Sequence, residues 1–135
     1  YCSVCRKTAG GGGYAITLAA ASDTLRVTGK EKVGVYHARG CEGRGPEEAS
    51  PAERHFCTAC GSALYLWDPR WPDLVHPFAS AIDTPLPAPP ERVHIMLNSK
   101  ADWVEVPDGA HDQRFEEYPA ESIEEWHRRR GLLEP

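Results

Sequence analysis

Residues 55–67 read HFCTACGSALYLW, a cysteine pair followed by an apolar segment, and this stretch determines the fold. Cys57 and Cys60 form a C-x-x-C turn, a spacing that places two sulfurs on one side of a tight knuckle. Gly61 follows directly, and its conformational freedom suits such a turn. Residues 63–67 carry large apolar side chains and predict a strand. The stretch therefore predicts a cysteine knuckle built onto a β-strand.

Outward from this stretch, short β-leaning segments separated by glycine and proline dominate the chain. Strands are expected at 14–18, 25–28, 33–37, 74–75, 78–82, 92–97 and 103–106, with a polar loop over 38–53 that contains Cys41. One helix is expected over 121–130, because Pro119 precedes it, acids fill its first turns and arginines fill its last turn. The prediction is a mainly β domain with one C-terminal helix.

The composition limits the classes of protein to consider. The chain has 135 residues, which suits a single domain over 1–135, and no apolar run approaches the roughly 20 residues that span a bilayer. Its net charge of −5 argues against nucleic acid as the main partner and against electrostatic binding to a membrane. The basic run 128–130 is explained by its place at a helix terminus. A small globular domain without nucleic acid or membrane partners is predicted.

A second C-x-x-C pair, Cys2 and Cys5, lies at the beginning of the sequence. Five cysteines cannot all form internal disulfides, and two C-x-x-C pairs suit metal coordination in a reducing cytoplasm. Zinc is the commonest ion for such thiolates, with iron a weaker candidate. Because a ligand motif at a chain end would be poorly held, further residues are expected upstream of Tyr1.

Three other interpretations of the cysteines stay open at this point. The thiols could be buried apolar side chains, a thioredoxin-like redox pair, or ligands of one shared four-cysteine site. The redox interpretation normally requires a helix that begins at the motif, whereas glycines and a predicted strand follow Cys5. Arg6 and Lys7 would favour thiolates nearby, and the glycine run 10–13 is either an anion-binding nest or a flexible turn.

The two cysteine motifs with their flanks resemble the glutathione-dependent formaldehyde-activating family, to which centromere protein V also belongs. The likeness covers residues 2 to about 103 and includes CSVCRK at 2–7, RHFCTACGS at 54–62 and SAID at 80–83. It implies a beta-tent fold of small antiparallel sheets around zinc-binding cysteine knuckles. The polar loop then corresponds to an insertion.

The resemblance also implies two separate zinc sites. Cys2 and Cys5 match two of three ligands of the family's catalytic zinc, and Cys57 and Cys60 match half of its structural zinc site. The remaining ligands would precede Tyr1, and two zinc ions are expected for the complete chain. The residues alone equally suit one closed four-cysteine site, which would be structural.

By resemblance, the expected activity is that of a carbon–sulfur lyase which joins glutathione, or a similar thiol, to a small aldehyde such as formaldehyde. Cys2 and Cys5 would serve as ligands of the catalytic zinc, and Arg6, Lys7 or Gly10 would hold substrate carboxylates. The alternative is a non-catalytic, zinc-stabilised module that binds other proteins. The sequence does not decide the oligomeric state.

Overall fold

The computed structural model describes residues 1–41 and 43–132 of the chain. Five short strands form one antiparallel sheet in the order β1–β5–β4–β3–β2. Their bounds are Ala20–Ala21 (β1), Val33–Tyr36 (β2), Glu53–Cys57 (β3), Ala63–Trp67 (β4) and Leu74–Pro77 (β5). The predicted mainly β architecture is confirmed, and β2, β4 and β5 lie where strands were expected, whereas β3 was not predicted as a strand.

A second, smaller sheet pairs β6 (Val93–His94) with β7 (Gln113–Arg114) in parallel, so not every sheet is antiparallel as expected. The C-terminal helix is confirmed as α2, Ile123–Arg129. Ser122 caps it: the Ser122 hydroxyl accepts from the Glu125 N–H, and the Glu125 carboxylate accepts from the Ser122 N–H. Short 3₁₀ turns cover Ser22–Thr24, Lys30–Lys32, Ala79–Ala81 and Leu97–Ser99.

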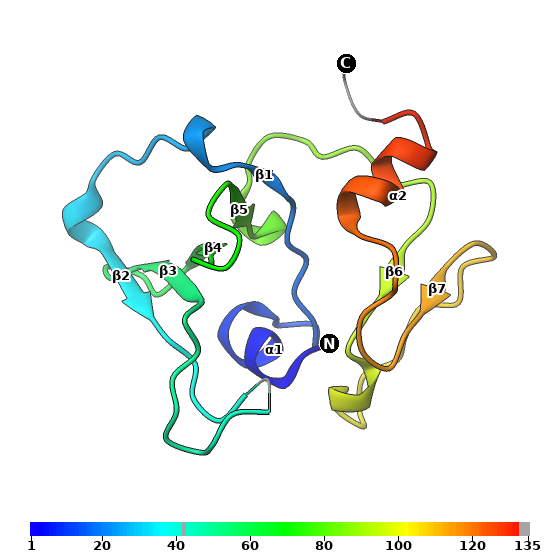
Figure 1. The fold of residues 1–135 in the computed structure, drawn as a ribbon, viewed down its shortest axis with the longest axis horizontal. Helices are drawn as coiled ribbons and strands as arrows, with labels where there is room; N and C mark the ends of the chain where they lie inside the picture. Colours follow the sequence, from blue (N-terminus) through cyan, green and yellow to red (C-terminus); the bar gives the residue numbers. More distant parts are fainter. Residues whose placement is uncertain (42, 133–135) are drawn as a thin grey trace.

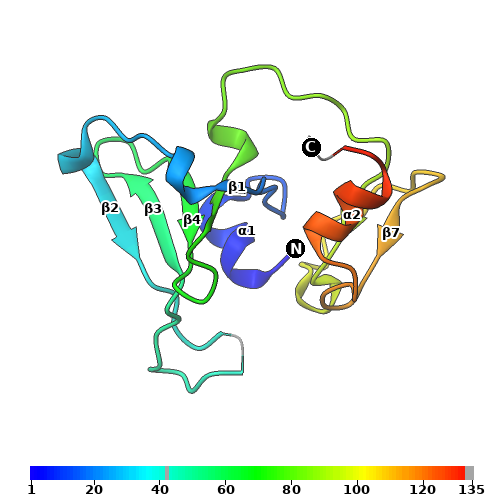
Figure 2. The ribbon, with the colours of Figure 1, turned by 45° about the horizontal axis from the view of Figure 1, so that its top comes forward.

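The first helix, α1 (Ser3–Ala9), was not predicted. It begins directly after Cys2 and lies between the five-stranded sheet and the group formed by β6, β7 and α2 (Figures 1 and 2). A helix does begin at the first C-x-x-C, so the expectation of no helix there, which counted against a redox pair, is wrong. None of the α1 residues is fully buried, so the helix contributes nothing to the buried core.

Several predicted strands are absent from the described residues. Residues 14–18 contribute only an isolated bridge between Thr17 and Phe78, and residues 25–28 and 103–106 form no strand. Residues 79–81 form a 3₁₀ turn where a strand was expected, and the strand expected at 92–97 shortens to β6. The loop that joins β2 to β3 projects away from the sheet (Figure 2), as its polar composition predicted.

The fully buried apolar core is small and centres on Phe78, which is 1% exposed, and Val75 of β5. The other buried apolar residues are Tyr1, Ala38, Ala52 and Val104. No helix in the described part of the chain has the length and apolar character that a bilayer crossing requires. The structure thus holds the two cysteine pairs on short elements around a limited core.

Candidate functional site

The Cys2–Cys5 pair lies at the start of α1, where Cys2 is the residue before the first helical turn. Both side chains are partly buried, and the interaction of the two neighbouring thiols lowers the pKa of Cys2 to about 5 and raises the pKa of Cys5. The backbone N–H groups of Cys5 and Val4 also favour the Cys2 thiolate. Of the two sulfurs, Cys2 is therefore the one that loses its proton more readily.

Arg54 of β3 reaches the same sulfur pair from the sheet. Its Nη2 lies 3.9 Å from the Cys5 Sγ and donates a hydrogen bond to it. Its Nε and Nη1 are buried and have no hydrogen-bond partner among residues 1–41 and 43–132. The sequence contained Arg54 only as a flank of the second cysteine motif, and a contact between residues 49 positions apart could not be inferred from spacing.

Tyr1 is fixed beside the first pair by two residues that sequence reasoning also missed. The Tyr1 hydroxyl and His94 Nδ1 are 2.9 Å apart, and His94 Nε2 is 3.4 Å from the Asp112 carboxylate. All three side chains are almost fully buried, and burial raises the pKa of the Tyr1 phenol. Because Tyr1 immediately precedes Cys2, the β6–β7 sheet holds the first cysteine motif in place.

The second pair, Cys57 and Cys60, forms the predicted knuckle between β3 and β4. Gly61 has φ +76° and its N–H donates to the Cys57 carbonyl at 2.8 Å, so the turn uses the freedom of glycine as expected. The Cys60 Sγ lies 3.1 Å from the Ser62 hydroxyl, and this hydrogen bond lowers the pKa of the exposed Cys60 thiol. The neighbouring Cys57 thiol lowers the pKa of Cys60 further.

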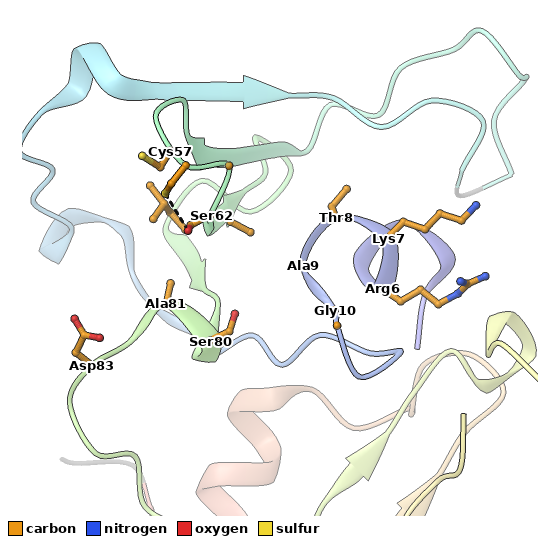
Figure 3. A pocket seen from close by; sticks show the side chains of 15 residues that line it. Arg6, Lys7, Thr8, Ala9, Gly10, Cys57, Ser62, Ser80, Ala81 and Asp83 are labelled. Atoms are coloured by element: carbon orange, nitrogen blue, oxygen red, sulfur yellow. Dashed lines mark hydrogen bonds between the residues drawn. The ribbon is translucent and has the colours of Figure 1, made fainter. Parts of the chain in front are cut away.

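A cleft of about 800 Å³ runs between α1 and this knuckle. One wall consists of residues 6–11, which include the predicted substrate-binding residues Arg6, Lys7 and Gly10, and the other wall includes Cys57, Cys60 and Ser62. Figure 3 shows the two walls facing each other, with the charged ends of Arg6 and Lys7 directed away from Cys57.

The cleft brings together some predicted site residues and leaves others outside. Arg6, Lys7 and Gly10 line it together with the second cysteine pair, whereas Cys2 and Cys5 are not among its lining residues. The Arg6 Nε is buried without a hydrogen-bond partner in the structure. The His55 ring stacks on Tyr65 and bonds to the Glu53 carboxylate at 2.9 Å, which places it in a separate cluster.

The donor chemistry of both pairs suits a soft divalent metal, because each pair offers two adjacent thiols. Across residues 1–41 and 43–132, however, no three His, Cys, Asp or Glu side chains come together in a way that could hold an ion. Each pair could therefore supply two of the ligands of a metal site. Among the described residues, the two pairs do not form one shared four-cysteine site.

Comparisons with known proteins agree with the resemblance found in the sequence. The family model described as glutathione-dependent formaldehyde-activating enzyme matches residues 1–99. A protein of Halomonas elongata, provisionally named a glutathione-dependent formaldehyde-activating enzyme, is 60% identical over 134 residues, which cover 99% of this chain and 82% of that protein. No solved structure matches. The chain therefore belongs to the glutathione-dependent formaldehyde-activating enzyme family.

Proposed function

We propose that this protein is a zinc-dependent carbon–sulfur lyase that adds glutathione, or a thiol like it, to formaldehyde or another small aldehyde. Family membership supports the class of reaction. The observation that carries the proposal is the pair of adjacent thiols of Cys2 and Cys5, held beside the guanidinium of Arg54. Such a pair would supply two ligands of a catalytic zinc, and Cys57 with Cys60 would supply two ligands of a second, structural zinc.

A bound zinc ion supplies Lewis acidity, which lowers the pKa of a coordinated thiol so that thiolate is present at neutral pH. In the reaction, the thiol sulfur forms a bond to the carbonyl carbon, the carbonyl π bond breaks, and the oxygen takes up the proton that the thiol lost. The product with formaldehyde is S-hydroxymethylglutathione. The reverse reaction breaks the same carbon–sulfur bond.

The chain's own residues would bind and orient the thiol. The cleft beside α1 has space for a tripeptide, and the backbone at Gly10 and the hydroxyl of Ser62 lie on its two walls. Arg6 and Lys7 lie on the wall formed by residues 6–11. Rotation of either long side chain would bring its positive charge to a carboxylate of the bound thiol. Holding both substrates in one orientation lowers the entropic cost of the addition.

The test is two-dimensional NMR exchange between glutathione and its formaldehyde adduct in the presence of full-length protein loaded with zinc. We expect the wild type to accelerate exchange and the C5S variant to lose the acceleration. C41S is the matched control, because Cys41 lies in the loop between β2 and β3 and belongs to neither pair. Exchange at the uncatalysed rate with the wild type would refute the proposal.

One observation favours a second candidate, a thiol–disulfide exchange activity of Cys2 with Cys5. The helix that begins directly after Cys2, together with the lowered pKa of its thiol, is the arrangement typical of a redox pair. This activity requires no metal. Reduction of a model disulfide by chelator-treated protein, with C2S inactive, would support it, and no reduction would exclude it.

A further inference from the structure

The inference concerns Arg54 and deepens the function proposed above, on which it rests. Arg54 extends from β3 toward α1, and its Nη2 is bonded to the Cys5 sulfur at 3.9 Å. Its two other nitrogens, Nε and Nη1, are buried and make no hydrogen bond with any described residue. No carboxylate in the described chain forms an ion pair with it, and the nearby Glu53 carboxylate is bonded to His55.

Arg54 is partly exposed as a residue, but its buried Nε and Nη1 have lost water without gaining a partner, which is unfavourable unless a neighbouring anion compensates the charge. The group that the structure places against Arg54 is the sulfur pair of Cys2 and Cys5. The two thiolates of Cys2 and Cys5 would balance the charge of one divalent ion, so each further thiolate would add one unit of excess negative charge. A fixed cation at the edge of such a cluster offsets that excess and makes room for one more anionic sulfur.

We propose that Arg54 is the counter-ion of the Cys2–Cys5 site, a positioning residue whose charge allows the site to hold zinc and to accept an additional thiolate from the substrate. The substrate class that this favours is an anionic sulfur rather than a neutral water or alcohol. Among the described residues, the partners of the Cys60 sulfur are Ser62 and Cys57 rather than an arginine.

The test is zinc affinity by competition with a chromophoric chelator, measured on the full-length protein at fixed pH and ionic strength. R54M and R54Q remove the charge, and R54M also leaves no polar group in the buried position. Loss of such an outer-shell partner typically weakens metal binding about 10–100-fold. We expect that loss for one zinc ion only, while the affinity for the other zinc ion stays within about twofold.

Two further variants separate charge from structure. R54K keeps the positive charge but lacks the planar guanidinium group. We therefore expect it to recover most of the zinc affinity that R54M loses. R26Q is the matched control, because Arg26 is exposed and donates only to backbone carbonyls of Asp23 and Leu25. Cobalt substitution gives a second readout, since the sulfur-to-metal absorption band reports thiolate ligation directly.

The outcomes are distinct. A wild type that binds no zinc overturns the proposed function and this inference with it. A wild type that binds zinc, together with R54M and R54Q variants of unchanged affinity, overturns the inference alone. Equal weakening of both zinc ions, or an R54K as weak as R54M, also overturns it, because either result assigns Arg54 a general role in folding.

Discussion

Substitution of Gly10 by alanine should damage the wall of the cleft, and the neighbouring Gly11 provides an internal control. A Cβ built at Gly10 would lie 2.3 Å from the Tyr14 carbonyl oxygen and 2.8 Å from the Arg6 Cα. Both atoms belong to the backbone, so neither can move aside as a flexible side chain would. The φ of Gly10 is −117°, which shows that space and not backbone strain makes glycine necessary here.

The expected cost follows from this overlap. Small-to-large changes in a tightly packed place cost about 1–3 kcal/mol in the free energy of unfolding. For a domain of this size, about 1 kcal/mol lowers the melting temperature by roughly 3–4 °C, so G10A should melt about 3–12 °C below the wild type. The Gly10 N–H bonds to the Arg6 carbonyl at 3.2 Å, so the end of α1 should shift as well.

G11A should behave differently although Gly11 lines the same cleft. A Cβ at Gly11 meets nothing within 4 Å, and the smaller entropy of the unfolded chain should leave the variant between neutral and about 1 kcal/mol more stable. Urea unfolding measures both variants, and the thiol–aldehyde exchange rate reports on the cleft. Unfolding free energies for G10A and G11A within about 0.5 kcal/mol of each other would refute the reasoning.

Two further predictions concern other parts of the fold. The side-chain hydrogen bond from Arg70 lowers the pKa of Asp68 below its usual 3.8. The ionised Asp68 therefore stabilises the folded state above pH 3.8. This contribution disappears as the pH falls through the lowered pKa. D68N should therefore be less stable than the wild type at pH 7, with a gap that shrinks in urea unfolding at pH 3, while D23N should show neither effect. S122A removes the α2 cap and should cost about 1 kcal/mol, whereas S122D should retain most of the stability; equal destabilisation by both would contradict the capping geometry.

The strands of the central sheet could be predicted because their local signals agree with their environment. The predicted strands at 63–67 and 33–37 correspond to β4 and β2, and both pair with β3 in the sheet. Their local strand propensity therefore agrees with the tertiary structure. The segment 14–18 has a similar composition but gains only one bridge, between Thr17 and Phe78. Strand propensity alone does not supply a pairing partner.

The first cysteine motif was the least predictable part. The α1 sequence SVCRKTA is short and lacks a strong capping residue, and an isolated helix of this length is unstable in water. In the folded chain it lies between the five-stranded sheet and the β6–β7 group (Figure 1). The same packing brings Arg54 to Cys5 and His94 to Tyr1, contacts across 49 and 93 residues that no local pattern encodes.

The two cysteine pairs could be predicted from spacing, but their positions relative to each other required three-dimensional information. A C-x-x-C pair brings its own two sulfurs together through local geometry, and both pairs show this arrangement. Whether two pairs share an ion depends on how distant segments pack. The described residues keep Cys2 with Cys5 next to Arg54 and keep Cys57 with Cys60 next to Ser62.

The most direct test of two separate zinc sites is the zinc content per chain of full-length wild type, C5S and C60S, measured by atomic emission on freshly purified protein. Two sites predict two zinc ions in the wild type and one in each variant, with C5S inactive. A wild type with one zinc ion that both variants lose would show a shared site and contradict the account.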